Sequence, residues 1–287
     1  MEDFVKRFVL ISILLLALTG IGLKLYARHT AAENKLAVKT EESRATSEEK
    51  PKTREPKPEQ EPTPDPAEPE PAPQHTPPNG PLICIDAGHQ AHGNPEPETI
   101  APSSTKTKAK VASGTRGVST GIDEYVFTLR FSMLLKDKLE AAGYRVGMVR
   151  DRHDVDISNQ ERARIANDMG ADLYLRIHAN GTGDSSVKGI ETFYPSPNNP
   201  DIGYLSAPSE KLSKLILHEM ANAAGAKARG AIARDDLTGT NFATMPNCLI
   251  ECGYMSNPEE DRLLNDDAYL NKLADGIVKA INLYYQS

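Results

Sequence analysis

Two histidines and two glutamates in this 287-residue chain stand where reactive side chains usually stand, at the ends of apolar strands or at the start of a helix. His89 follows the apolar run 82–85, His178 closes the apolar run 173–178, and Glu124 falls in the first turn of an expected helix. Two imidazoles and one carboxylate are a ligand set of catalytic zinc sites, which keep a fourth position open for water. We therefore predict that His89, Glu124 and His178 hold one zinc ion per chain.

The chemistry expected of such a site is the hydrolysis of an amide or an ester, because zinc acidifies a water molecule and polarises a carbonyl group. The reaction also needs a group that takes a proton from water and returns it to the leaving group. Glu251 ends the apolar strand 248–251, where an unpaired buried carboxylate would be costly without a partner or a role. We predict that Glu251 is this general base and acid.

Each of these assignments has a rival. His92 competes with His89 as a ligand but lies in a polar stretch. Glu124 could be only a favourable acid at a helix start, and Glu251 could orient a histidine or complete an ion pair. Asn180 and Arg234 are further candidates for the lining of the cleft.

Other metal or disulfide motifs are not indicated. His218 and Glu219 lack the second histidine of an H-E-x-x-H motif, which favours an ordinary helical pair. Cys84, Cys248 and Cys252 show no C-x-x-C spacing and lie in or beside apolar runs, so we interpret them as small buried hydrophobic residues.

The part of the chain from residue 81 to 287 alternates strand and helix patterns, which predicts an α/β fold with a mostly parallel central sheet flanked by helices. The carboxyl ends of parallel strands meet at one edge, so both histidines should lie at the same edge. The stretch 92–121 is polar and is expected to be a surface loop. The expected strands are 82–85, 144–149, 173–178, 189–194 and 248–251, and the expected helices are 122–142, 158–170, 209–224, a short one after 257, and 268–285.

The first 32 residues contain sixteen consecutive uncharged residues, 8–23, preceded by Lys6 and Arg7. The stretch 5–26 is long enough to cross about 30 Å of hydrocarbon. We predict a transmembrane anchor in preference to a cleaved signal segment, because no good cleavage site follows the apolar core. The lysines and arginines after the core outnumber those before it, which by itself argues against export of the carboxyl side.

Residues 33–80 differ sharply in composition, with eleven of the 21 prolines, eleven acidic and seven basic residues. Such a segment cannot bury enough apolar surface to offset its ordering entropy, so we expect a disordered linker. In polyproline II conformation it would reach up to about 150 Å. An anchor, a spacer and a globular part suit an enzyme or binder that works away from the membrane, on a cell wall.

The net charge of −7 and the lack of a basic block argue against nucleic-acid binding. The three predicted segments are thus an anchor or signal segment at 1–32, a linker at 33–80 and a catalytic domain at 81–287. We expect the domain to lie outside the cytoplasm, held by a single-pass membrane helix, or to be secreted to the wall if the segment is cleaved.

Four blocks of the sequence resemble a known family. Ile85-Asp-Ala-Gly-His89, Glu124 at a helix start, Arg176-Ile-His178-Ala-Asn180 and 249–257 are similar to the signature blocks of zinc-dependent N-acetylmuramoyl-L-alanine amidases of type 3, bacterial cell-wall hydrolases. The resemblance covers nearly all of residues 82–285. It implies a sheet of about six strands, zinc held by His89, Glu124 and His178, and Glu251 as the catalytic carboxylate. It also implies that the bond cut joins the lactyl group of N-acetylmuramic acid to L-alanine in peptidoglycan.

The chain departs from the family pattern after its first histidine, where Gln90 and some thirty residues precede Glu124. This stretch could cover the cleft or shape substrate choice. Two other functions stay open at this point: a zinc peptidase that cuts within the stem peptide, and a non-catalytic wall-binding or regulatory domain. The released products distinguish them, and an activator protein, the oligomeric state and the physiological process are left open by the sequence.

Overall fold

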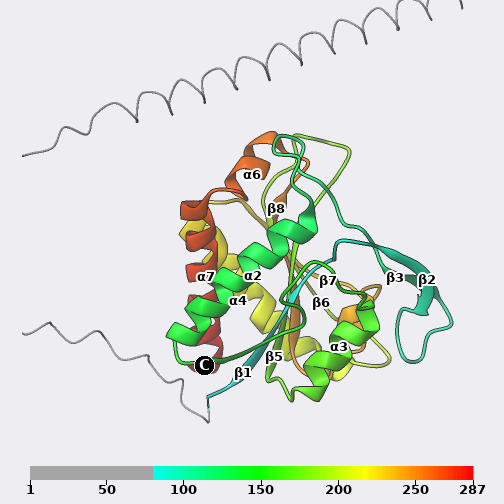
Figure 1. Ribbon diagram of the computed structural model, residues 1–287. Coiled ribbons are helices and arrows are strands. Elements are labelled where there is room, and N and C mark those ends of the chain that lie inside the picture. Colours follow the sequence, from blue (N-terminus) through cyan, green and yellow to red (C-terminus); the bar gives the residue numbers. More distant parts are fainter. Residues whose placement is uncertain (1–79, 287) are drawn as a thin grey trace, which may run out of the picture. The chain divides into compact units, whose positions relative to one another are not determined.

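The computed structural model describes residues 80–286 (Figure 1). The predicted membrane segment 1–32 and nearly all of the predicted linker 33–80 lie outside the described residues. Among the described helices, none combines the length and apolar character needed to cross a membrane.

A six-stranded sheet forms the centre of the fold, with the strand order β4-β1-β5-β8-β6-β7. The first four of these strands are parallel, β6 is antiparallel to β8, and β7 is parallel to β6. This confirms the prediction of a mostly parallel sheet flanked by helices. The strands are β1 (Leu82–Ala87), β4 (Arg145–Met148), β5 (Leu173–Asn180), β6 (Ile190–Tyr194), β7 (Ala228–Ala233) and β8 (Asn247–Tyr254).

Helices cover both faces of the sheet (Figure 1). On one face, α2, α4 and α7 pack over the larger apolar core, which includes Ile83, Ile177 and Ile250. On the other face, α3 and α5 lie over a smaller cluster around Cys84 and Tyr174. The helices are α2 (Glu124–Ala141), α3 (Asn159–Asp168), α4 (Ser206–Ala224), α5 (Thr238–Asn241), α6 (Pro258–Leu263) and α7 (Asp267–Gln286), with a short 3-10 helix at Gly203–Leu205.

Local sequence signals account for the ends of several helices. The capping box expected at Ser158 and Glu161 is present at the start of α3. Gly225 ends α4 in the left-handed conformation that glycine adopts without steric cost. The Asn257 side chain accepts the amide protons of Glu259 and Glu260, and Pro258 follows it at the first helical position of α6.

The prediction of a surface loop at 92–121 was wrong in part, because this stretch contains an antiparallel hairpin of β2 (Asn94–Thr99) and β3 (Thr107–Val111). The hairpin has few apolar residues and therefore no hydrophobic pattern to reveal it. Polar side chains dock it onto its neighbours: Gln160 bonds the Thr99 carbonyl at 2.9 Å and Asn159 bonds the Lys110 carbonyl at 2.7 Å. The edge strand β7 and the short helix α5 were also not predicted.

Candidate active site

The first histidine is held in an unusual backbone conformation just beyond β1. His89 is the one non-glycine residue with positive φ (58°) in the described part of the chain, a conformation that persists only where the surroundings determine it. Its Nδ1 lies 2.7 Å from the carbonyl oxygen of Ala112. A carbonyl can only accept, so Nδ1 donates and the lone pair of Nε2 faces the site.

Two buried arginines hold the turn that carries His89. Arg162 donates to the carboxylate of Asp86, to the carbonyls of Ala87 and His89, and to the side chain of Gln90. Arg150 donates to the carbonyls of Ala87 and Gly88 at 2.8 and 3.0 Å. Three successive carbonyl groups are thus tied to two guanidinium groups, which explains how the strained backbone at His89 is maintained.

Glu124 is the first residue of α2, as predicted, and its carboxylate reaches both histidines. Its Oε1 lies 3.2 Å from His89 Nε2 and 3.1 Å from His178 Nδ1. Its Oε2 accepts a hydrogen bond of 2.9 Å from the backbone amide of Thr115. The helix start therefore delivers a carboxylate between two imidazoles that belong to distant parts of the sequence.

The ligand atoms of His89, Glu124 and His178 lie within 4.8 Å of one another. His178 Nε2 is buried without a hydrogen-bond partner among the described residues. Space for the rings depends on glycine: a Cβ atom at Gly88 would lie 2.4 Å from the ring of His178, and one at Gly114 would lie 2.8 Å from Glu124 Oε2. Two nitrogens and one oxygen in this arrangement fit a zinc ion.

The electrostatics of these three groups reflect burial and mutual contact. Burial lowers the pKa of His178 to about 4, which keeps this imidazole neutral at pH 7. Burial would also lower the pKa of His89, but its contacts with Glu124 and the Ala112 carbonyl outweigh burial and raise it. Glu124 has a lowered pKa because the two histidines outweigh the effect of its burial. A metal ion would therefore compete with a proton at His89.

Glu251 lies beside the three donors on the neighbouring strand β8. In the register of the sheet it is opposite His178 of β5 on one side and Glu191 of β6 on the other. Its Oε2 is buried and has no hydrogen-bond partner among the described residues. Burial and the nearby charges of Glu124 and Glu191 raise the pKa of Glu251 well above its ordinary value. The unpartnered Oε2 therefore takes part in no ion pair among the described residues.

A cavity of about 420 Å³ opens next to these groups. It is lined by His178 and Arg176 of β5, by the β3 end of the hairpin, and by the segment that leads into α5. The stretch after the first histidine thus forms a wall of the cavity. That it covers the cleft or shapes substrate choice stays a prediction. The lining residues include Lys108, Ala112, Asn159, Thr238 and Leu249.

The remaining candidates fall in different places. His92 is exposed and is not one of the three residues that converge. Asn180 donates to Glu191, and Arg234 lies over the ring of Phe193. Neither is among the residues that line the cavity, so the expectation that they line the cleft was wrong. His218 on α4 contacts Glu219 at 3.1 Å, an ordinary pair of helical neighbours.

Several residues of the site region were not found from the sequence. Arg150 and Arg162 gave no signal because each lies in a polar segment. Arg176 and Glu191 each interrupt the apolar pattern of a buried strand, and this is the signal that could have drawn attention to them.

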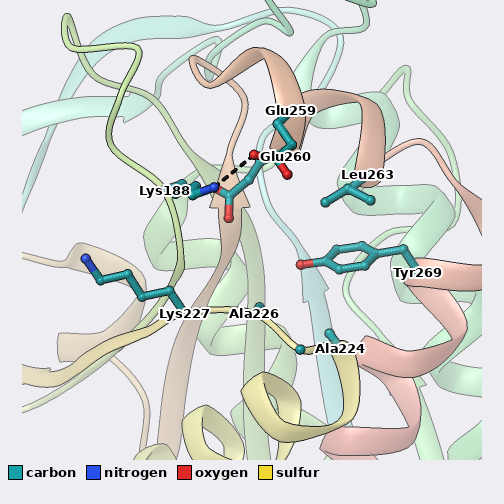
Figure 2. Close-up of a pocket in the computed structure, with 9 residues that line it drawn as sticks. Lys188, Ala224, Ala226, Lys227, Glu259, Glu260, Leu263 and Tyr269 are labelled. Carbon is teal, nitrogen blue, oxygen red and sulfur yellow. Dashed lines mark hydrogen bonds and ion pairs between the residues drawn. The ribbon is translucent and has the colours of Figure 1, made fainter.

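A second, smaller cavity of about 110 Å³ lies between the end of α4, the helix α6 and the start of α7 (Figure 2). Lys188 pairs with Glu259 at 2.9 Å, and the hydroxyl of Tyr269 points towards the space (Figure 2). Both carboxylate oxygens of Glu260 accept backbone amide protons, from Gly189 and Tyr254. These contacts connect α6 to the start of β6 and the end of β8. None of the predicted catalytic residues lines this cavity.

Comparison with known proteins identifies the family of the chain. Residues 83–283 match the family model described as N-acetylmuramoyl-L-alanine amidase. The chain belongs to this family. The amidase Rv3717 of Mycobacterium tuberculosis is 28% identical over 215 residues, covering 72% of this chain and 88% of the relative. The amidase LytC of Bacillus subtilis is 30% identical over 169 residues, which cover 59% of this chain and 32% of that longer protein.

Solved structures agree with this family membership. The crystal structure of the amidase Ami1 from Mycobacterium smegmatis has 28% sequence identity and a TM-score of 0.65, covering 72% of this chain and 97% of that one. The amidase CwlD from Clostridioides difficile, solved in complex with the GerS lipoprotein, has 25% identity and a TM-score of 0.54, covering 72% and 99%. This amidase therefore hydrolyses the bond between the lactyl group of N-acetylmuramic acid and L-alanine in peptidoglycan.

Proposed function

We propose that this amidase is zinc-dependent, with His89, Glu124 and His178 as the zinc ligands and Glu251 as the catalytic carboxylate. One observation carries the proposal: nitrogens of His89 and His178 lie 3.2 and 3.1 Å from the same oxygen of Glu124. The neighbouring Glu251 has a buried oxygen without a partner among the described residues. A zinc ion in this site would supply a Lewis acid for the scissile carbonyl group and acidify a water molecule.

The chain's own residues carry the proton transfers. Glu251 takes a proton from the attacking water and then returns it to the nitrogen of L-alanine as the amide bond breaks. Burial and the neighbouring carboxylates raise the pKa of Glu251, which makes its carboxylate a stronger base and favours the proton that it must then hold as the acid. His89 and His178 keep fixed orientations, since the Ala112 carbonyl sets the tautomer of one and Glu124 contacts the other.

We also propose that the amidase domain acts outside the cytoplasm, held to the membrane by residues 1–32 through the linker 33–80. Support comes from the substrate, which is a wall polymer, and from the uncharged run 8–23. Because CwlD is a relative solved with a lipoprotein, binding of a protein partner is a further proposal for this chain.

The test uses the full-length chain purified in detergent. Its zinc content is measured by atomic emission, and purified peptidoglycan is digested and the new ends are identified by mass spectrometry. We expect about one zinc per chain and released peptides that begin with L-alanine. Peptides cut at an internal bond would instead support the stem-peptide hydrolase, and a chain without zinc would contradict the assigned ligands.

A further inference from the structure

The cavity beside the zinc donors has a positively charged floor. Arg176 lies in its lining, 3% exposed, with Nε 3.2 Å from the carboxylate of Asp86. That carboxylate is shared with Arg162 at 2.7 Å, and Arg150 joins the same cluster through the Ala87 carbonyl. Three buried guanidinium groups therefore stand against one carboxylate, an excess of two positive charges.

No further acid forms an ion pair with these side chains among the described residues, although Arg176 also interacts electrostatically with the nearby carboxyl group of Glu251. Arg150 bonds five partners: the carbonyls of Ala87, Gly88, Tyr125 and Arg152, and the hydroxyl of Thr128. Burial and the charge of Arg162 lower the pKa of Arg150 to about 10. Charges in a poorly hydrated interior act on a neighbouring cavity more strongly than charges in water.

A lysine adds to this charge from the opposite wall. Lys108 on β3 donates to the backbone carbonyl of Asp236, and its Nζ lies 3.5 Å from the Asp236 carboxylate. The same carboxylate already accepts two bonds from Arg234, at 2.8 and 2.6 Å. Lys108 and Arg234 therefore share the single carboxylate of Asp236, which leaves the three side chains with one net positive charge. A positive cavity stands out in a chain whose formal net charge is −7.

We propose that this cavity is a carboxylate subsite for the peptide side of the substrate, with Arg176 and Lys108 as specificity-determining residues. The inference rests on the proposed function and deepens it. On the sugar side of the scissile bond, an N-acetylated amino sugar and its lactyl amide are uncharged. The peptide side carries carboxylates, and the residue after L-alanine is a glutamate whose α-carboxyl group is either free or amidated. A positive cavity therefore selects the free acid.

The test compares two synthetic substrates with the zinc-loaded full-length enzyme: N-acetylmuramoyl-L-alanyl-D-isoglutamate and the corresponding amide, D-isoglutamine. We expect kcat/KM to be about tenfold higher for the acid, because hydrogen bonds between ionised partners are roughly twice as strong as neutral ones. The preference should weaken as salt is added, since Lys108 is partly exposed.

Matched variants assign the preference to residues. Lys108→Gln should raise KM for the acid, leave the amide unchanged and reduce the preference to about threefold or less. Lys110→Gln is the control, because Lys110 lies on the same strand but pairs with Glu96 at 2.7 Å and does not line the cavity. Arg176→Lys keeps the positive charge beside Asp86 but loses the planar guanidinium group. It should therefore also reduce the preference for the acid over the amide substrate. If that variant does not fold, Lys108→Gln still decides the question.

The possible results distinguish failure of the carboxylate subsite from failure of the proposed zinc-dependent amidase function. Equal cleavage of acid and amide by the wild-type enzyme would overturn the subsite and leave the amidase standing. An unchanged preference in Lys108→Gln, or an equal change in Lys110→Gln, would overturn the role of Lys108. Cleavage of neither compound, with equal binding of the two product dipeptides in a direct calorimetric titration, would overturn the proposed function and the subsite together.

Discussion

At the scale of single residues, Glu251 differs from the other acids of the site in having no partner for one buried oxygen. Glu124 contacts two histidines and two backbone amides, and Glu191 accepts bonds from Arg229, Tyr254 and Asn180. We therefore infer a chemical role for Glu251, which lies opposite His178 and Glu191 in the sheet and has an unpaired buried oxygen.

Replacement of Glu251 by glutamine should therefore abolish turnover without loss of zinc. We expect kcat to fall by roughly 10²–10⁴-fold, the usual contribution of a general acid and base, while zinc content stays at the wild-type value. Turnover of muropeptides and metal content of the same preparation check this. Activity close to that of the wild type would remove Glu251 from the mechanism.

The predicted zinc site also depends on the absence of a side chain at Gly88. A methyl group there would lie 2.4 Å from the ring of His178, so Gly88→Ala should displace the imidazole and weaken zinc binding at least about tenfold, with a cost of about 1–3 kcal/mol in stability. Competition with a chromogenic chelator measures the affinity. Gly183→Ala is the control, because a Cβ atom there meets nothing within 4 Å; equal affinities in the two variants would contradict the steric argument.

At the scale of elements, the site is assembled where the ends of β1, β5 and β8 meet the start of α2. Arg162 connects the end of β1 to helix α3. Its five guanidinium donors reach the side chains of Asp86 and Gln90 and three backbone carbonyls. No other side chain type presents such a fork. A helix that supplies no predicted zinc ligand therefore sets the position of one.

Arg162→Lys should show this coupling between α3 and the metal site. The variant keeps a positive charge near Asp86 but cannot satisfy all five acceptors, so we expect a loss of about 2–4 kcal/mol in the free energy of unfolding and weaker zinc binding. Denaturant unfolding of the chelated protein and a zinc titration give the two quantities separately. A loss of stability with unchanged zinc affinity would show that the turn at His89 does not depend on the arginine.

At the scale of the whole molecule, the buried charges make folding sensitive to acid. Burial would raise the pKa of Asp86, but the charges of Arg162 and Arg176 outweigh burial and hold it well below its ordinary value. A depressed pKa means that the unfolded chain binds a proton before the folded one does. The stabilisation is therefore complete above the unfolded pKa of about 3.9 and is lost as the pH falls towards the folded pKa.

Asp86→Asn tests this linkage. At pH 7 the variant should be less stable by about 3–5 kcal/mol, because it leaves buried arginines without their carboxylate. Between pH 5 and 2 its stability should fall less steeply than that of the wild type. Thermal unfolding of both proteins in the presence of a chelator across this range measures the difference, and parallel curves would assign the acid sensitivity to other groups.

The sequence by itself determined the features that depend on local chemistry. Apolar runs predicted the buried strands β1, β5, β6 and β8, and the Ser158 capping box and Gly225 marked helix ends. These signals are local, because burial of a single strand requires apolar residues and the ends of a single helix require capping residues. The ends of expected strands selected His89, His178 and Glu251 as candidates, and an expected helix start selected Glu124. The structure places Glu251 inside β8 rather than at its end. The roles assigned to the four candidates remain predictions for the experiments above.

Only the tertiary structure decided which polar residues support the site. Arg150, Arg162 and Lys108 come from β4's end, α3 and a polar hairpin, and none carries a pattern that distinguishes it from a solvated surface residue. They act through contacts across 62 to 128 positions of the sequence, such as Arg150 with Gly88 and Lys108 with Asp236. The strand order brings β1 between β4 and β5, and the separate hairpin contributes Lys108 to the lining of the cavity. Hydrogen bonds between polar groups far apart in the sequence produce no periodic sequence pattern, so only the tertiary structure shows them.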